Sequence, residues 1–541
     1  MEQRRLKLPI GIQTFEEIRT NGYIYVDKTK YFIDMIDSGK IYFLARPRRF
    51  GKSLAVSTFD ALFSGEKDLF KGLYAEEFFN RPDYKTSPII RIDMSKVVTD
   101  FGMDYLIESL KQVTIEIAEK IEVDVPKHLA PGDFLRSLIV NAAKKYNQKV
   151  VILIDEYDKP YTDFVNEPEI AENVRKLLRS YYVQIKTGDE HIRFTFITGI
   201  SKFAKFGVFS VLNSPLDISL MPKYAEICGL TEAEIIQYFP DYLEETANEM
   251  QITIEELIEK MRYHYNGFSF DSDAKTRLYN PYSTLTFFAN KIFLNYWIET
   301  GRSKVIADFM KKHNLTVEQF RYMPITLDFA KSPGDVDTAP PEGFLYQCGY
   351  LTLRPGTGND LTLDYPNTEV LNSMSAMVSE NILRGRDDDF SCCRSDMIDA
   401  LMSSDHNLFV TVFNRLLASI PYDDFSHVAK KIVYKKRYNY SVNEWLYRSS
   451  ILMFLRGCGV LSFAEMHTNL GRSDIVIVYC GNIWVVEIKV AYAGKSPTKK
   501  AEEALKQIVD NNYAAPYPNA VCIGLAIDDT VRQITDFRIV S

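Results

Sequence analysis

The stretch FLARPRRFGKSLAVS, Phe43 to Ser57, lies between an apolar run of strand length and a segment with helical spacing. Gly51, Lys52 and Ser53 are in register with the phosphate-binding pattern G-x-x-x-x-G-K-[ST]. Arg46 occupies the place of the first glycine but leaves the amides around Gly51 in place. In such a loop, backbone amides and a helix N-terminus surround the phosphates, the lysine reaches the β- and γ-phosphates, and the serine ligates Mg²⁺. The stretch therefore predicts a nucleotide site.

A second motif lies downstream in KVVILIDEYDKP, residues 149–160, where an apolar strand pattern runs into two carboxylates. At the C-terminal end of a parallel strand, Asp155 is placed to hold the Mg²⁺ shell and Glu156 to polarise the attacking water. The separation from the loop, about 100 residues, leaves room for the strand PIIRIDM at 88–94. This is the order expected of NTPases that insert one strand between the two motifs.

The next strand pattern, RFTFITGIS at 193–201, ends in hydroxyl side chains. Thr198 and Ser201 would stand at its C-terminal end, where a γ-phosphate sensor would lie. Each piece is modest alone, because GKS is a common tripeptide and a carboxylate after a strand is often a helix N-cap. The three pieces in this order favour a nucleotide site over coincidence.

The spacing of apolar residues predicts an α/β fold. Short apolar runs alternate with amphipathic stretches between 41 and 231, which indicates a parallel sheet covered by helices. The last of these runs, EICGL at 226–230, is expected to be a strand. A helix-rich stretch at 231–268 follows and predicts a helical lid.

The middle of the chain, FLYQCGYLTLRPGTGNDLTLDYPNTEVL at 344–371, predicts a helix end, two strands around a Pro-Gly-Thr-Gly turn and a further helix start. That is the order of a winged helix. The polar stretch at 384–400 is expected to be a surface loop or linker. Four domains follow: a P-loop sheet domain at 1–220, a helical lid at 221–300, a middle helical and winged-helix-like region at 301–429, and a C-terminal α/β domain at 430–541.

Two strand patterns in the C-terminal region, 473–480 and 483–490, flank a Gly-Asn turn and predict a β-hairpin. Glu487 and Lys489 are two residues apart, so they face the same side of the sheet, and Asp474 would lie close to Glu487 across the pair. Two carboxylates and an amine on one face suit a divalent metal. Both carboxylates would bind Mg²⁺, and Lys489 would orient or deprotonate a water for attack on a phosphodiester. A structural cross-strand ion pair is the alternative.

Five short motifs occur in order along the N-terminal half: LPIGIQTFEEI at 8–18, YVDKT at 25–29, RPRRFGKS at 46–53, LIDEYD at 153–158 and YNGF at 265–268. Together they resemble the bacterial AAA-ATPase-like family over residues 8 to about 290. The loop of that family carries Arg-Pro, so Arg46 is no departure from it. The resemblance implies a P-loop NTPase in which Lys52 and Ser53 bind phosphate and Mg²⁺ while Asp155 and Glu156 serve the metal and the water.

Two further sets of residues in these motifs are less defined. Arg46, Arg48 and Arg49 would touch phosphates or an adjoining domain, with a solvated or salt-bridged loop as the alternative, and Arg46 is counted among the nucleotide-binding residues. The YVDKT motif, with Tyr25 and Lys28, has no evident chemical role and is expected to pack beside the sheet.

The C-terminal pattern, GRSD at 471–474 with EIK at 487–489, resembles the PD-(D/E)XK nuclease superfamily, with Ser473 in place of the usual proline. A helix pattern, three strands, a second helix and a further strand follow the order of that superfamily. The resemblance implies a restriction-endonuclease-like α/β domain, in which Glu444 contributes a third acidic group and Gln507 contacts substrate. The AAA-ATPase-like family commonly ends in such a domain.

The composition narrows the class of protein. No apolar run reaches 18 residues and the N-terminus lacks a signal-peptide pattern, so a cytoplasmic protein without a membrane partner is expected. The seven cysteines form no C-x-x-C pair and have no histidine at zinc-ligand spacing, which argues against a structural zinc site. Although the net charge is −8, residues 430–541 carry 15 Lys+Arg against 10 Asp+Glu. This excess indicates either a polyanion partner or an ordinary lysine surface.

The sequence therefore predicts an ATP-binding and ATP-hydrolysing protein that uses Mg²⁺ and controls a metal-dependent nuclease. Its expected partners are ATP and, at the C-terminal domain, nucleic acid, with DNA favoured over RNA; homo-oligomerisation is left open. The alternative is a non-hydrolysing nucleotide-gated scaffold with a degenerate nuclease core. Glu156 favours the enzyme, because a pure binding site does not need a second carboxylate beside Asp155.

Overall fold

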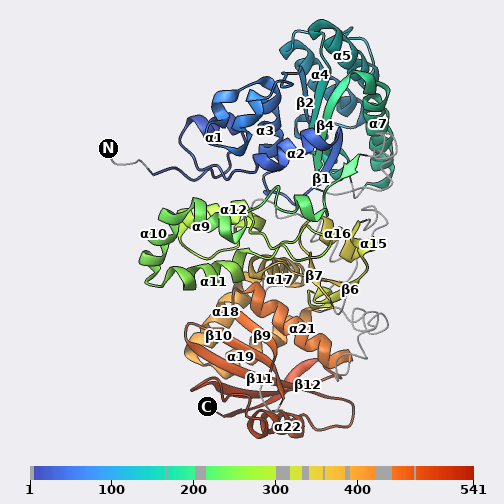
Figure 1. The fold of residues 1–541 in the computed structure, drawn as a ribbon. Helices are drawn as coiled ribbons and strands as arrows, with labels where there is room; N and C mark the ends of the chain where they lie inside the picture. The colour runs from blue at the N-terminus through green and yellow to red at the C-terminus, as the bar shows by residue number, and fades with distance from the viewer. Residues whose placement is uncertain are drawn as a thin grey trace. The chain divides into compact units, whose positions relative to one another are not determined.

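A computed structural model of the chain describes residues 5–164, 167–200, 215–299, 317–331, 340–356, 360–383, 390–420, 442–467 and 471–540. Contacts divide the chain into two compact units, which are described separately (Figure 1). The first unit is Met1–Thr300 with Tyr322–Glu369, and the second is Gly301–Arg321 with Val370–Ser541. The predicted middle region at 301–429 is thus divided between them.

The first unit is built on a five-stranded parallel sheet in the order β2-β3-β4-β1-β5. Its strands are β1 (Ile41–Ala45), β2 (Ile89–Asp93), β3 (Val150–Asp155), β4 (Ile192–Gly199) and β5 (Leu216–Asp217). Every residue of β3 is buried, as expected of a strand covered on both faces, which explains its uninterrupted apolar run. The predicted parallel sheet is confirmed.

The strands that carry the phosphate-binding loop and the carboxylates of residues 155–156 are not arranged in the sheet as they are in the sequence. The strand between β1 and β3 is β4, which comes later in the chain, whereas β2 lies at the edge of the sheet. Crossover connections allow this, because parallel strands need not be neighbours in sequence.

The segment at 226–230 was expected to be a strand, and that prediction is wrong. Its amides bond to other loops: Gly229 donates to the carbonyl of Phe50 and Leu230 to that of Tyr279, both at 3.2 Å. Gly229 also has a φ of +89°, which bends the chain out of an extended path. Gly229 lies against Phe50 of the phosphate-binding loop, while Leu230 is buried in the core of the helices that follow.

Helices cover both faces of this sheet (Figure 1). On one face lie α1 (Phe15–Thr20), α2 (Thr29–Ser38) and α3 (Lys52–Ser64), and on the other α4 (Met103–Lys120), α5 (Pro131–Tyr146) and α7 (Pro168–Thr187), with the short α6 (Lys159–Thr162) after β3. Short 3-10 turns lie at Lys67–Phe70, Tyr74–Asn80, Met94–Lys96, Asp189–His191 and Pro222–Tyr224.

The predicted helical lid is confirmed as a helical segment with its own apolar core. It consists of α9 (Glu232–Tyr238), α10 (Pro240–Met250), α11 (Ile254–Tyr265), α12 (Pro281–Asn290) and α13 (Tyr296–Glu299). Thr231 and Thr253 begin α9 and α11 with capping boxes, in which each threonine hydroxyl accepts from the amide of a glutamate three residues later.

The winged-helix-like region has the predicted order of elements. They are β6 (Met323–Ile325), α15 (Leu327–Lys331), α16 (Pro341–Gln347), β7 (Thr352–Pro355) and β8 (Leu361–Asp364), after a turn at Glu318–Phe320. The three strands form an antiparallel sheet in the order β6-β8-β7, which places the first strand beside the last. The helix predicted to follow is α17 (Thr368–Leu383).

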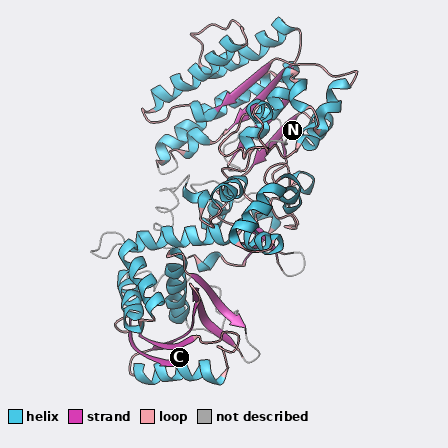
Figure 2. Cartoon of the chain, turned by 90° about the vertical axis from the view of Figure 1, so that its left-hand side faces the viewer, coloured by secondary structure: helices cyan, strands magenta, loops and turns pink. Residues whose placement is uncertain are grey.

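The second unit contains a mixed five-stranded sheet in the order β13-β12-β11-β10-β9. Its strands are β9 (Leu461–His467), β10 (Arg472–Tyr479), β11 (Asn482–Ala491), β12 (Val521–Asp528) and β13 (Gln533–Val540). The β10–β11 hairpin is antiparallel, as predicted, and β11 runs parallel to β12 through the crossover helix α22 (Pro497–Asp510). Figure 2 shows this sheet between helices, an architecture consistent with the nuclease-like α/β domain.

Three helices, α18 (Phe390–Ser403), α19 (His406–Ser419) and α21 (Val442–Gly457), share one core with the sheet of the second unit. The prediction of a surface loop at 384–400 is therefore wrong from residue 390 onward, and its first part, 384–389, lies outside the described residues. Cys393, Met397, Ala400 and Leu401 are buried in that core. Their helical spacing is present in the sequence but is obscured by the polar residues between them. Among the described residues, no helix is long and apolar enough to cross a bilayer.

The YNGF motif has a clear packing role in the first unit. Gly267 has a φ of +109°, and a Cβ added there would lie 2.0 Å from the carbonyl oxygen of Pro366. The next residue, Phe268, packs edge-to-face on Phe50 of the phosphate-binding loop, with ring centroids 4.8 Å apart. The glycine therefore lets the chain approach Pro366 while the phenylalanine supports the loop.

We expect Gly267→Ala to destabilise the first unit by about 3 kcal/mol or more, because it adds a steric clash to an unfavourable backbone conformation. Gly22→Ala is the matched control, since Gly22 also has positive φ but nothing lies within 4 Å of the added carbon. The control should cost only about 1 kcal/mol. Thermal unfolding of the full chain measures both, and equal melting temperatures for the two variants would contradict the packing role.

Candidate functional sites

The phosphate-binding loop joins β1 to α3 in the first unit. Gly51 immediately precedes α3 with a φ of 94°, a conformation that glycine adopts readily. The ammonium of Lys52 donates to the carbonyl oxygens of Arg46 at 3.0 Å and Pro47 at 2.9 Å, inside the loop. Burial lowers the pKa of Lys52, although the nearby carboxylates Asp155 and Glu156 oppose that change. A buried, loop-held ammonium is suited to phosphate.

Arg46 differs from its predicted role as a nucleotide-binding residue. Its side chain is 1 % exposed, and Nη1 donates to the carbonyls of Ala45 at 2.9 Å and Ser219 at 2.8 Å. The guanidinium also lies over the ring of Phe270, 4.3 Å from its centroid. These contacts give Arg46 a structural role, because its donors bind carbonyls below the loop and it does not line the cavity described below.

Asp155 ends β3, as predicted, and Glu156 follows it. The Oδ1 atom of Asp155 accepts from the hydroxyl of Thr198 at 2.6 Å and from the amide of Glu156 at 3.1 Å. Thr198 is fully buried on β4, so its hydroxyl orients Asp155 and is not among the groups facing the cavity. The other predicted sensor, Ser201, lies outside the described residues.

Glu156 has an unusual backbone and an unusual acidity. Its φ is 51°, in the left-handed region that non-glycine residues seldom adopt. Burial raises the pKa of its carboxyl group, opposed by Lys52 and reinforced by Asp155. Strained backbone and perturbed acidity at one position are typical of functional sites.

A cavity of about 460 Å³ opens over the loop. Its polar lining includes Gly51, Lys52, Ser53 and Glu156, together with Arg48 and Arg49. Its apolar lining includes Ile12, Ile18, Ile24, Val26, Phe32, Phe239 and Leu285. A largely apolar pocket with a few charged and polar groups is typical of small-molecule sites.

The sequence missed the part that the N-terminal motifs play in this cavity. Tyr25 and Lys28 of the YVDKT motif line it, in addition to packing beside the sheet. Lys28 is buried and forms an ion pair with Glu234 of α9 at 2.5 Å. The signal available in the sequence was that the YVDKT motif shortly precedes the loop motif. Spacing alone, however, does not show that the two motifs line one cavity.

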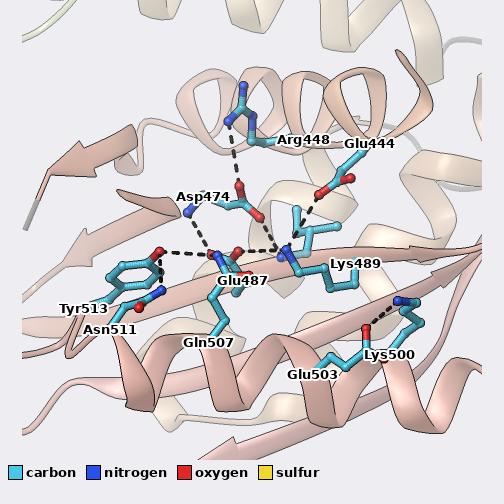
Figure 3. A network of polar contacts seen from close by, with 11 residues as sticks. Glu444, Arg448, Asp474, Glu487, Lys489, Lys500, Glu503, Gln507, Asn511 and Tyr513 are labelled. Atoms are coloured by element: carbon cyan, nitrogen blue, oxygen red, sulfur yellow. Dashed lines mark hydrogen bonds and ion pairs between the residues drawn. The ribbon is translucent and has the colours of Figure 1, made fainter. Parts of the chain in front are cut away.

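In the second unit, the predicted hairpin brings Asp474, Glu487 and Lys489 together (Figure 3). The amide of Asp474 donates to Glu487 Oε2 at 3.2 Å, and Lys489 Nζ donates to Glu487 Oε1 at 3.2 Å. Asp474 Oδ2 accepts from the amide of Ile488 at 2.8 Å. Asp474 and Glu487 are each 1 % exposed, so they form one buried acidic pair.

Residues from two helices border this pair. Glu444 of α21 has its Oε1 atom 4.0 Å from Lys489 Nζ, which places it on the same side as the acidic pair. Arg448, one turn later on α21, has Nη1 3.8 Å from Asp474 Oδ1 and was not singled out from the sequence. Gln507 of α22 donates to the hydroxyl of Tyr513 at 3.3 Å (Figure 3).

Burial and the closeness of the two carboxylates make the fully ionised acidic pair unfavourable. Burial, followed by the negative charge of Asp474, raises the pKa of Glu487 to about 8. Burial also raises the pKa of Glu444. Burial lowers the pKa of Lys489, but the surrounding carboxylates outweigh it, so this pKa lies above its ordinary value. Lys489 therefore keeps its proton at neutral pH.

The donor set fits Mg²⁺ in part. Within the described ranges, no group of three or more His, Cys, Asp or Glu side chains is arranged to hold a metal. Mg²⁺ usually keeps several waters and uses one or two protein carboxylates, which matches the pair Asp474 and Glu487. A divalent cation would also relieve the repulsion that holds the pKa of Glu487 high.

Sequence comparison finds a known family over each of the two regions that hold the candidate sites. Residues 9–209 match the family described as predicted AAA-ATPase, and residues 442–537 match the PD-(D/E)XK nuclease superfamily. An uncharacterized protein in the vnfD 5′ region of Azotobacter chroococcum mcd 1 is 33% identical over 525 residues, covering 95% of this chain and 94% of that protein. The chain belongs to the AAA-ATPase-like family.

The AAA-ATPase-like match ends at residue 209, whereas the cavity draws on residues as far as Leu285. The helical segment after the sheet thus contributes Phe239, Tyr282 and Leu285 to the lining of the cavity. Among solved structures, Cdc6p from Pyrobaculum aerophilum is 11% identical with a TM-score of 0.22, covering 68% of this chain and 97% of that chain. A score of that size carries no argument.

The raised pKa of Glu487 predicts a pH-dependent stability. Between the ordinary glutamate pKa and about 8, the folded state holds more protons than the unfolded state, so the free energy of unfolding falls as pH rises. We expect Glu487→Gln, which cannot ionise, to melt close to the wild type near pH 4 and several degrees above it near pH 9.

Differential scanning calorimetry of the full chain without metal measures this difference across the pH range. Glu503→Gln is the control, because Glu503 lies on α22 in an ion pair with Lys500 and away from the acidic pair. A melting difference that is the same at every pH would contradict the raised pKa.

Proposed function

We propose that this AAA-ATPase-like protein binds and hydrolyses ATP with Mg²⁺ at its N-terminal site and cleaves phosphodiester bonds of nucleic acid, DNA in the first instance, at its C-terminal site. We further propose that the nucleotide state sets the cleavage rate. The observation that carries the proposal is the buried convergence of Asp474, Glu487 and Lys489 in a chain that also carries Gly51, Lys52 and Ser53 of a phosphate-binding loop.

Three features support ATP hydrolysis at the first site. Lys52 and Ser53 are among the polar residues that line a cavity of about 460 Å³, a volume within the usual range for small-molecule sites. Asp155 ends the strand β3 and is held by Thr198, an arrangement suited to ordering the Mg²⁺ shell through water. Glu156 faces the cavity with a raised pKa, as a group that polarises water requires.

At the second site, Mg²⁺ bound by Asp474 and Glu487 would activate a water and polarise the scissile phosphate. The chain's own residues have three tasks around it. Lys489 keeps its proton, so it stabilises negative charge on the phosphate and orients the water, which favours that role over deprotonation. Glu444 is placed beside Lys489 as a third acidic group.

The excess of basic residues at 430–541 supports a polyanionic substrate for this domain. Lys495, Lys499 and Lys500 lie in and just after the loop that leads from β11 to α22. This loop follows directly on the strand of Glu487 and Lys489. Nucleic acid bound along it would reach the acidic pair from the same element.

We expect Lys52→Ala to weaken ATP binding by about 10- to 100-fold, because it removes the charge facing the β- and γ-phosphates. Lys71→Ala is the control, since Lys71 forms an exposed ion pair with Asp68 in the same unit. Glu156→Gln should keep the wild-type affinity and lose about 100-fold or more in turnover. Calorimetry and phosphate release measure the two effects. Wild-type affinity in Lys52→Ala would refute the loop assignment.

We expect Asp474→Ala, Glu487→Ala and Lys489→Ala each to abolish Mg²⁺-dependent cleavage of labelled DNA and RNA while ATP binding is unchanged. Residues that act as one unit lose function together, so double variants should be no worse than single ones. Glu503→Ala on α22 is the control and should cleave normally. If no form cleaves and the single variants only melt earlier, the cluster is a structural ion-pair network and the protein is a scaffold.

The same cleavage assay tests control by nucleotide. ATP should change the rate, and Glu156→Gln should hold the ATP-dependent rate because it binds without hydrolysis. Identical rates with ATP, with ADP and without nucleotide would overturn the coupling and leave both sites as independent assignments.

A further inference from the structure

Arg448 is a buried cation at the C-terminal site that belongs to neither of the sequence motifs. It lies on α21 one helical turn after Glu444, and both side chains face the acidic pair (Figure 3). Its side chain is 6% exposed, and Nη1 is 3.8 Å from Asp474 Oδ1, whose own side chain is 1% exposed. Burial of a guanidinium costs several kcal/mol unless a partner of opposite charge is close.

Asp474 is held from two directions. One carboxylate oxygen, Oδ2, accepts from the amide of Ile488 at 2.8 Å, so the strand β11 fixes that half of the group. The other oxygen, Oδ1, faces Arg448, which extends from the helix α21. The hydrogen bond from Ile488 and the charge of Arg448 thus act on the two different oxygens of this carboxylate.

The charge balance of the site also requires this residue. Three carboxylates, Glu444, Asp474 and Glu487, meet within one buried cluster, and Lys489 interacts with Glu487 and Glu444. Lys489 also interacts with Asp474, and the charges of Arg448 and Lys500 both act on Glu444. Removal of Arg448 would take away the guanidinium that lies 3.8 Å from Asp474 and would leave the cluster with less positive charge.

A second buried arginine on the same helix has a different partner. Arg456, two turns after Arg448, pairs with Glu318, which precedes the winged-helix-like region. Arg456 forms the ion pair with Glu318, and the charge of Arg448 acts on Glu318 as well as on Asp474. The two arginines are equally buried but differ in what they hold.

We propose that Arg448 is a positioning residue of the nuclease site, which holds Asp474 in the orientation that binds the divalent cation. This inference rests on the proposed nuclease function. Groups that orient a metal ligand commonly contribute 10- to 100-fold to metal affinity or activity.

The test is Mn²⁺ binding to the full chain without nucleotide, measured by isothermal calorimetry for the wild type, Asp474→Ala, Arg448→Met and Arg448→Lys. Asp474→Ala identifies the heat that belongs to this site. We expect Arg448→Met to weaken that binding by about 10- to 100-fold. The Mn²⁺ affinity of Arg448→Lys should lie between those of the wild type and Arg448→Met, because lysine restores the charge but not the planar fork of the guanidinium.

The matched control replaces both members of the other pair, Arg456→Met with Glu318→Gln, so that no buried charge is left alone. This double variant should bind Mn²⁺ as the wild type does, even if its melting temperature falls. A melting curve for each variant separates lost affinity from lost structure. If Arg448→Met does not fold, Arg448→Lys alone decides: weaker binding supports the proposal and equal binding overturns it.

Unchanged or tighter Mn²⁺ binding in Arg448→Met would overturn the positioning role, since tighter binding would mean that Arg448 only repels the cation. The failure of the proposed function looks different. In that case Asp474→Ala binds Mn²⁺ like the wild type, and both the metal site and the role of Arg448 are rejected.

Discussion

The burial of charged side chains on the two sheets is the constraint on which both candidate sites depend. A carboxylate or ammonium withdrawn from water costs several kcal/mol unless hydrogen bonds or an opposite charge compensate it. In the first unit, Thr198 and a backbone amide compensate Asp155, while loop carbonyls compensate Lys52. In the second, the amide of Ile488 compensates Asp474. The surrounding fold therefore fixes the geometry of each charged group.

The two sites use this constraint differently. In the first site, neutral hydroxyl, amide and carbonyl groups hold the charged side chains. Its cavity therefore has hydrogen-bond donors at the loop and a carboxylate at Glu156. The second concentrates three carboxylates around Lys489 and Arg448 and keeps the pKa of Glu487 near 8. Repulsion of this kind favours a cation, whereas the loop favours an anion. The two candidate sites thus differ in the charge of the ligand that each would favour.

Sequence motifs predicted which segments form the two candidate sites but not the hydrogen-bond partners of every side chain in them. The loop, the carboxylates after β3 and the hairpin pair follow from local patterns, and all lie where the spacing placed them. Arg46 and Thr198 lie in the expected segments, yet their polar atoms bond to Ala45, Ser219 and Asp155. Ser219 and Asp155 are distant in sequence from the residues that they bond, so no spacing rule reveals these contacts.

The sequence by itself determined the main strands, most of the helices and the motifs that hold the candidate site residues, because periods of 2 and 3.6 residues and turn signals are local properties. Only the tertiary structure decided that β4 separates the two nucleotide motifs, that residues 226–230 bond to the loop, and that Arg448 faces Asp474. These outcomes depend on which distant segments share a core and on which buried charge needs which partner. Both are set by contacts across the fold, where local periodicity carries no information.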